Sequence, residues 1–183
     1  MIDFLYAEIN VAGIILLLLF LNNMKRKGHK NLSIDQHLFN SCMIMNILIF
    51  AFDTGMWLID GNQQAVARPV NYIVTMLYYI SNPLICFMWL LYTDFKIYES
   101  RNGLFKRIPF YIIPSVVNTV LSIISLYTGW LFVIDANNNY MRGPHFWAMA
   151  FAALFYLVFS CGISIKDVAK NGWEENKSIT IHL

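Results

Sequence analysis

The chain has 183 residues, of which 58% are apolar and only 13% are charged. Soluble domains carry roughly 45–50% apolar and about 25% charged residues, so this composition favours a membrane protein. The formal net charge of +2 is too small to argue for nucleic-acid binding. The three cysteines form no C-x-x-C pair and no disulfide framework.

Five apolar stretches account for most of the chain. A helix rises about 1.5 Å per residue, so about 20 residues cross the roughly 30 Å of hydrocarbon in a bilayer. Each stretch reaches that length, and the short loops make consecutive helices antiparallel neighbours. The sequence therefore predicts an all-α integral membrane protein, a bundle of five transmembrane helices over residues 4–24, 38–59, 70–92, 108–131 and 146–165.

This division predicts a transmembrane helical domain over residues 1–165 and a short polar cytoplasmic tail over residues 166–183. The spans leave no room for a soluble catalytic domain. The sequence also contains no H-E-x-x-H motif, no Walker A loop and no G-x-S-x-G elbow. We therefore expect no enzymatic activity, no cofactor and no metal site.

Basic residues are distributed unevenly between the loops. Eleven of the 13 lysines and arginines fall in the first loop, the third loop and the C-terminal tail, whereas Arg68 and Arg142 alone fall in the second and fourth loops. Because cytoplasmic loops retain Lys and Arg, we expect the N-terminus outside and the C-terminus inside. Trp57, Trp130 and Trp147 fall at the predicted outer ends, as in an interfacial aromatic belt.

Two prolines, Pro83 and Pro114, fall inside the third and fourth spans. Neither can donate to the carbonyl one turn earlier, which belongs to Tyr79 and Phe110 respectively. Each proline is expected to kink its helix and to leave a carbonyl that needs another donor. The neighbouring polar side chains that could help are Asn82 and Ser115.

Polar side chains inside the spans give the main indication of function. A charge in the membrane interior costs at least about 2.5–3.5 kcal/mol, so it usually faces the bundle interior or a cavity. Asp53 lies about two-thirds of the way along the second span. Asn46, Asp53 and Asp60 are spaced by seven residues and share one helical face, with Trp57 one turn after Asp53.

These residues predict a polar pocket that opens to the exterior, with Asp53 near Glu8 or the third-span asparagines and with Arg68 and Arg142 at its surface. The alternative is hydrogen bonding between helices, worth about 0.6 kcal/mol per bond on average, which is favoured for Asn118, Ser122 and Ser125. The candidate ligand-binding or polar-core residues are Glu8, Asn46, Asp53, Trp57, Asp60, Asn71, Asn82, Asn118 and Arg142.

Several short motifs carry a resemblance to a known family. They are Tyr6–Asn10 (YAEIN), Asp53–Gly61 (DTGMWLIDG), Asn71–Asp94 with its S-N-P core, Asn118–Trp130 ending in T-G-W, and Tyr140–Pro144 (YMRGP). Over residues 1–165 the chain resembles the N-terminal multi-helix membrane input region of diguanylate cyclases, the GGDEF-domain signalling proteins of clostridia and related Firmicutes.

The resemblance implies a sensor or transmitter domain of cyclic-di-GMP signalling in a bacterial plasma membrane. In that family about two further membrane helices and the catalytic domain follow, whereas this sequence turns polar after Ile165 and ends. We therefore expect no cyclase activity. The expected partners are the lipid bilayer, a cytoplasmic signalling partner or a second copy, and a small extracellular ligand.

Two alternatives stay open. One is a small transporter or channel-like protein with Asp53 and Asp60 on an ion path. Transporters more often show inverted repeats and paired broken helices, and the sequence shows no convincing repeat. The other alternative is a truncated remnant without a function of its own.

Overall fold

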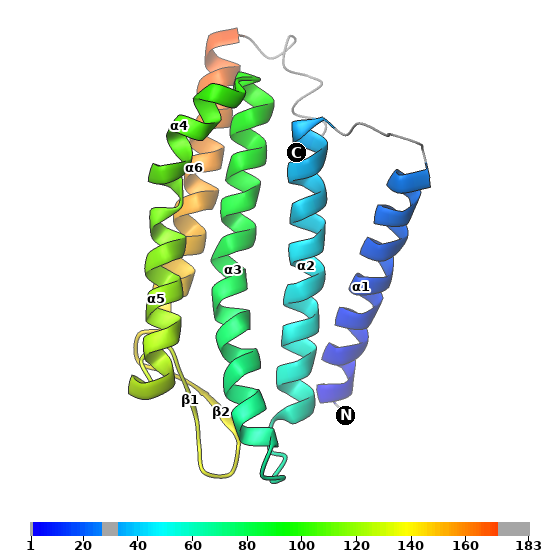
Figure 1. Cartoon of the computed structure of the whole chain (residues 1–183), viewed down its shortest axis with the longest axis vertical. Helices are drawn as coiled ribbons and strands as arrows, with labels where there is room; N and C mark the ends of the chain where they lie inside the picture. Colours follow the sequence, from blue (N-terminus) through cyan, green and yellow to red (C-terminus); the bar gives the residue numbers. More distant parts are fainter. Residues whose placement is uncertain (1, 27–32, 172–183) are drawn as a thin grey trace.

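The computed structural model describes residues 2–26 and 33–171 as a bundle of long helices with a small β-hairpin at one end (Figure 1). Five helical segments are long and apolar enough to cross a membrane, as the sequence predicts, and helices α4 and α5 together make one of them. The elements in chain order are α1 (Ile2–Arg26), α2 (Ile34–Ile59), α3 (Ala67–Tyr98), α4 (Arg101–Tyr111), α5 (Ile113–Thr128), β1 (Phe132–Ile134), β2 (Tyr140–Arg142) and α6 (Trp147–Asn171).

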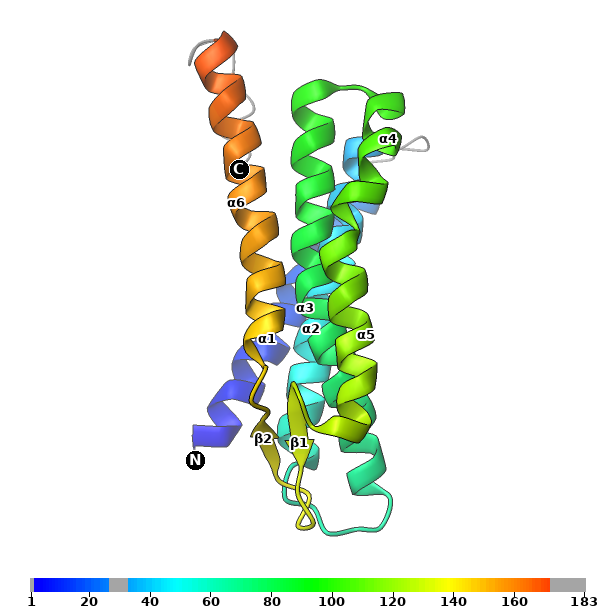
Figure 2. The same cartoon turned by 90° about the vertical axis from the view of Figure 1, so that its left-hand side faces the viewer.

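Helix α3 lies in the middle of the bundle and packs against α2, α5 and α6. Figure 2 shows α5 and α6 on different sides of α3. Helix α1 lies at the edge of the bundle and packs along α2 (Figure 1). We call the end with β1 and β2 the hairpin end, and the end with the α3–α4 connection the α4 end.

Several helices extend beyond the apolar stretches that predict them. The side chain of Gln36 accepts a hydrogen bond from the backbone N–H of Ser33, 3.1 Å away, which fixes the start of α2 at Ile34. Helix α3 continues six residues past Tyr92, because Thr93 and Asp94 are buried against neighbouring helices. Helix α6 includes residues 166–171 of the predicted polar tail. The rest of that tail lies outside the described residues.

The fourth apolar segment consists of α4 and α5, and we call it the fourth pass. It differs most from the prediction of one helix over residues 108–131. It breaks at Ile112, between α4 and α5. Helix α5 ends at Thr128, and the next residue, Gly129, has a φ of 68° in the left-handed region that favours glycine. The chain then forms the antiparallel strands β1 and β2, with Phe132 opposite Arg142. Residues 135–139 connect the two strands.

The carbonyl that Pro83 frees is satisfied by a neighbouring helix. Helix α3 runs continuously through Pro83, and the side-chain amide of Asn118 on α5 donates to the Tyr79 carbonyl at 2.9 Å. Asn82, the neighbour suggested by sequence, instead donates to the carbonyl of Tyr78 within its own helix, also at 2.9 Å. The interhelical bond predicted for Asn118 therefore has a definite purpose, which is to complete the hydrogen bonding of α3.

The break near Pro114 is bridged by a tyrosine of α6. The hydroxyl of Tyr156 accepts from the backbone N–H of Ser115 and donates to the carbonyl of Tyr111, both at 2.9 Å. These two backbone groups would bond each other in an unbroken helix. A side chain inserted into the helical hydrogen-bond ladder is a known cause of a kink.

Apolar side chains form two buried clusters and also cover the outside of the bundle. One cluster lies towards the α4 end, around Leu90 and Tyr156, and the other lies at the hairpin end, around Tyr79 and Phe132. Large apolar side chains are also exposed along the outer faces of the helices, as expected for surfaces in contact with lipid tails.

Candidate functional site

A cavity of about 400 Å³ lies at the hairpin end, between α2, α3, β2 and the start of α6. We call it the hairpin-end cavity. Four of the nine candidate residues line it, namely Asp53, Trp57, Asp60 and Arg142. The rest of its wall is aromatic or apolar and consists of Met56, Tyr78, Tyr79, Tyr140, Phe146, Met149 and Ala150.

Asp53 is held by a residue of the first helix. The side-chain amide of Asn10 donates to Asp53 Oδ2 at 2.7 Å, and Asn10 itself is buried between α1 and α2. The sequence instead predicts Glu8 or the third-span asparagines as neighbours of Asp53. Glu8 is exposed, and neither Asn71 nor Asn82 lines the cavity. The carboxyl group of Asp53 is thus half-buried and oriented by an amide donor, as a partly buried polar group requires.

Asp60 and two tyrosines fix the wall that β2 contributes. Asp60 Oδ1 accepts from the backbone N–H of Tyr140 at 2.7 Å. The hydroxyls of Tyr140 and Tyr79 are hydrogen-bonded to each other at 2.8 Å. The hairpin is therefore tied to both α2 and α3 at the cavity, and its residues have defined positions in the cavity wall.

Arg142 provides the positive charge of the cavity. Its guanidinium lies over the ring of Phe146, 5.4 Å from the centroid, in the geometry of a cation–π contact. The ion pairs found in the described part of the chain, Asp35–Lys96 and Asp94–Arg107, both lie at the other end of the bundle. Arg142 is therefore close to the acidic residues of the cavity without being paired to them.

The remaining candidates serve the fold of the bundle. Asn46 donates to the carbonyl of Cys42, one turn earlier in α2, at 3.2 Å. Asn71 is fully buried and donates to Asn138 Oδ1 at 3.1 Å, which fastens the hairpin turn to α3. Asn82 and Asn118 complete backbone hydrogen bonding, as described above. Arg68, expected at the surface of the pocket, donates to the carbonyl of Ile134 in β1 at 3.3 Å.

The two serines that share a face with Asn118 also bond backbone groups. Ser122 donates to the carbonyl of Asn118 in its own helix at 2.8 Å. Ser125 accepts from the N–H groups of Leu131 and Phe132, at 3.0 and 3.1 Å, and so fixes the start of β1. The polar stripe of α5 is therefore structural along its length.

The sequence pattern does not predict the roles of two groups, Asn10 and Asp94. Asn10 belongs to one of the motifs that carry the resemblance, and its position in an apolar span was the only other signal. Asp94, placed just outside the third span, is fully buried and bonds both Arg107 and Tyr111. Only the pairing of an acidic and a basic residue across the predicted α3–α4 loop could have indicated this network.

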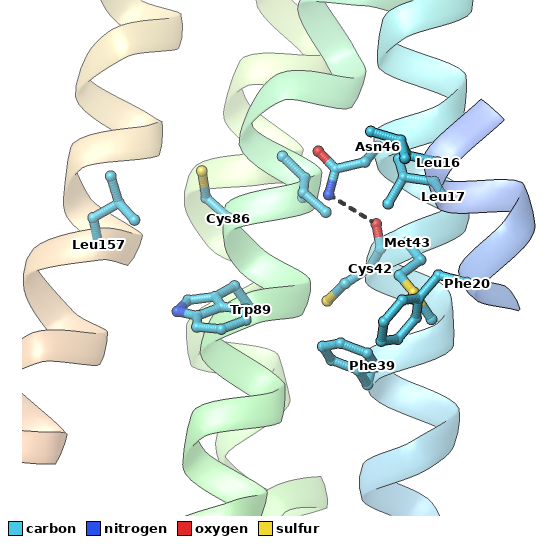
Figure 3. Close-up of a pocket in the computed structure, with 11 residues that line it drawn as sticks. Leu16, Leu17, Phe20, Phe39, Cys42, Met43, Asn46, Cys86, Trp89 and Leu157 are labelled. Atoms are coloured by element: carbon cyan, nitrogen blue, oxygen red, sulfur yellow. Dashed lines mark hydrogen bonds between the residues drawn. The ribbon is translucent and has the colours of Figure 1, made fainter. Parts of the chain in front are cut away.

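A second cavity, of about 550 Å³, lies between α1, α2, α3 and α6. Figure 3 shows Phe39, Cys42 and Met43 of α2 on one side of it, and Trp89 of α3 and Leu157 of α6 on the other. Asn46 is the one residue with a polar amide or charged side chain among those that line it. This cavity is therefore apolar and separate from the hairpin-end cavity.

Among residues 2–26 and 33–171, no group of three or more His, Cys, Asp or Glu side chains is placed to hold a metal ion. No protein-family model, no curated protein and no solved structure shows significant similarity to this chain. The hairpin-end cavity, with its charged and aromatic wall, is the candidate functional site.

Proposed function

We propose that this chain is a membrane-embedded signal-input module of the type found at the N-terminus of diguanylate cyclases. In this proposal a small solute binds in the hairpin-end cavity, and the change passes along the helices to a cytoplasmic partner or a second copy. One observation carries the proposal: charged side chains from α2 and β2 converge on one cavity at the start of α6.

The distribution of basic residues supports an orientation with the hairpin end outside a bacterial plasma membrane. The hairpin end carries Arg68 and Arg142, which contact β1 and Phe146 respectively. The α4 end carries many more basic residues, in the order Lys96, Arg101, Lys106, Arg107, Lys166 and Lys170. Because basic residues are retained on the cytoplasmic side, the cavity would open to the exterior.

Helix α6 supplies a route from the cavity to the opposite end. Met149 and Ala150, in its first turn, line the cavity, and the helix continues to Asn171 at the α4 end (Figure 2). Midway, Tyr156 holds the break between α4 and α5. A shift of α6 on ligand binding would therefore change the packing of the fourth pass, as in helix shifts that transmit signals elsewhere.

An ion path through the bundle, the alternative function, has weaker support. Asp53 and Asp60 line the hairpin-end cavity, but the neighbouring cavity between α1, α2, α3 and α6 is apolar except for Asn46. Ion paths are usually lined by carbonyl groups or rings of charged side chains, and the described lining of the second cavity holds neither.

A reporter fusion tests the proposed function. The full chain is fused at its C-terminus to a diguanylate cyclase domain, and cyclic-di-GMP is measured in cells that express equal membrane levels of each variant. Asp53→Leu and Asp60→Ala should change the output several-fold. Asp35→Asn, at the α4 end, should leave it unchanged. Equal output from all four fusions would refute a signalling role of the cavity.

Labelling of single cysteines tests the orientation. In a variant without Cys42, Cys86 and Cys161, a cysteine replaces either Gln64 at the hairpin end or Lys106 on α4. A membrane-impermeant maleimide added to intact cells should label Gln64→Cys and leave Lys106→Cys unlabelled. The reverse pattern would place the cavity on the cytoplasmic side and overturn the proposal.

A further inference from the structure

We propose that the hairpin-end cavity binds a small organic ammonium ion. The inference rests on the proposed function of the cavity as a ligand site and names the chemistry of the ligand. Three properties of the cavity wall carry it: its net charge, its aromatic rings and its apolar side chains.

The charge of the wall is the first argument. Asp53 and Asp60 contribute two negative charges and Arg142 one positive charge, so the lining residues carry a net charge of −1. Neither carboxylate is in an ion pair with a residue that the structure describes, and Arg142 lies against the ring of Phe146. Each carboxylate also has one oxygen without a hydrogen bond to any described residue, since Asn10 binds Oδ2 of Asp53 and the backbone of Tyr140 binds Oδ1 of Asp60. A monovalent cation would therefore balance the site.

The aromatic rings are the second argument. Five of the 11 lining residues are aromatic: Trp57, Tyr78, Tyr79, Tyr140 and Phe146. The ring of Phe146, just before α6, already has the Arg142 guanidinium over it, so the candidate rings for a ligand are the other four, from α2, α3 and β2. The faces of such rings carry negative potential and attract ammonium groups, with indole the strongest. Cages of aromatic rings are how proteins recognise alkylated ammonium groups. The wall therefore matches an organic cation better than an inorganic one.

The apolar contribution separates an alkylated ammonium ion from a hydrated metal ion. Met56, Met149 and Ala150 complete the lining and offer surface to methyl or methylene groups. A hard cation such as Ca²⁺ needs six to eight oxygen ligands, which this wall does not provide. The cavity volume of about 400 Å³ falls near the lower end of the range for ligand sites, so the ligand is a small molecule.

A pair of ligands of similar shape and different charge tests the inference. The full-length protein in nanodiscs of phosphatidylglycerol is titrated by calorimetry with choline and with 3,3-dimethylbutan-1-ol, in which carbon replaces the ammonium nitrogen. Choline should bind at least about tenfold more tightly, because the neutral alcohol loses the attraction of the carboxylates and the rings.

Matched variants assign the binding to the cavity. Asp53→Asn and Trp57→Leu should each weaken choline binding by about tenfold. Asp35→Asn, which is distant from the cavity, should not change it. Trp130→Leu is the control for Trp57, because both indoles are 43% exposed at the hairpin end and Trp130 does not line the cavity. Equal losses from Trp130→Leu and Trp57→Leu would overturn the assignment.

The same titrations distinguish failure of this inference from failure of the proposed function. Equal affinity for choline and the alcohol, or no binding of choline at all, would overturn the ammonium proposal. The cavity variants could then still alter the reporter output, and the signalling role would stand. A repeat in phosphatidylcholine nanodiscs identifies the source of the ammonium group. A lipid headgroup in the cavity would weaken the apparent affinity for free choline, whereas unchanged affinity indicates a soluble ligand.

Discussion

Replacing Tyr156 with phenylalanine tests how the broken fourth pass is held together. The ring of Tyr156 is fully buried, and its hydroxyl contacts three groups of the α4–α5 break. It donates to the carbonyl of Tyr111 and accepts from the N–H of Ser115, and it also lies 2.8 Å from Ser115 Oγ. Tyr156→Phe keeps the ring and removes only the oxygen that serves these groups.

The expected loss of stability follows from the groups left without partners. A buried donor or acceptor without a partner costs about 1–3 kcal/mol in soluble proteins. Single side-chain bonds between membrane helices average about 0.6 kcal/mol and reach about 1.7, because the unfolded chain in the membrane finds other partners. One hydroxyl here serves both a backbone donor and a backbone acceptor. We therefore expect Tyr156→Phe to cost about 1–2 kcal/mol, a factor of roughly 5–30 in the unfolding equilibrium.

The assay is reversible unfolding in mixed micelles with increasing dodecyl sulfate, followed by tryptophan fluorescence. Ser115→Ala is the matched partner, because it removes the Oγ contact and leaves both backbone bonds of Tyr156 in place. It should cost less than Tyr156→Phe. Tyr127→Phe is the control, since Tyr127 is 91% exposed and should be neutral. If Tyr156→Phe matches the wild type, or Ser115→Ala costs more, then the hydroxyl does not hold the break.

Three further predictions concern other parts of the bundle. Asp94→Ala should cost about 2–3 kcal/mol of unfolding free energy in the same assay. This is less than the roughly 3–5 kcal/mol for breaking a fully buried ion pair, because the Arg107 side chain left behind is about one-third exposed. A neutral result would contradict a stabilising network. Asn138→Ala should destabilise the protein more than Asn138→Gly, because the backbone at this position has a φ of 62°, which glycine adopts more readily than alanine. A higher stability of the alanine variant would exclude backbone strain as the cause. Hydrogen bonds from the backbone and side chain of Asn139 and the backbone of Asn137 lower the pKa of Asp135 below its ordinary value. The carboxylate therefore stabilises the turn above its unfolded pKa, and this contribution is lost as the pH falls through the lower folded pKa. Amide protection factors in the turn, corrected for intrinsic exchange, should fall over that range in the wild type and stay constant in Asp135→Asn.

The five long apolar helical segments are predictable because hydrophobic length is a strong signal that tertiary contacts do not alter. The ends of the helices are less predictable, since they depend on contacts between residues far apart in the sequence. Helix α3 continues past Tyr92 because Asp94 finds Arg107 on the next helix. The hairpin follows from Gly129 and from Ser125, whose hydroxyl holds the first residues of the strand. Neither contact can be read from the apolar pattern.

The candidate site is likewise predictable only in part from the sequence. The heptad spacing correctly places Asp53 and Asp60 along one side of α2, and both line the hairpin-end cavity. Asn46 belongs to the same spacing but lines the apolar cavity instead. The two cavities lie one after the other along the same side of α2. The partner of Asp53 is Asn10, and a pairing between helices cannot be deduced from the period of either helix alone.

The bonds of Asn138 have a consequence for the order in which the bundle is assembled during synthesis. Its side-chain amide donates to the carbonyls of Ile59 and Asn62, which lie 79 and 76 positions earlier in the chain. The turn after α2 therefore leaves the ribosome well before the residue that completes its hydrogen bonding. Until then the carbonyls of Ile59 and Asn62 depend on water for a donor. Before the hairpin is made, α2 and α3 are therefore joined by packing and by the Asp35–Lys96 ion pair at the α4 end, and the hairpin then fastens them at the opposite end.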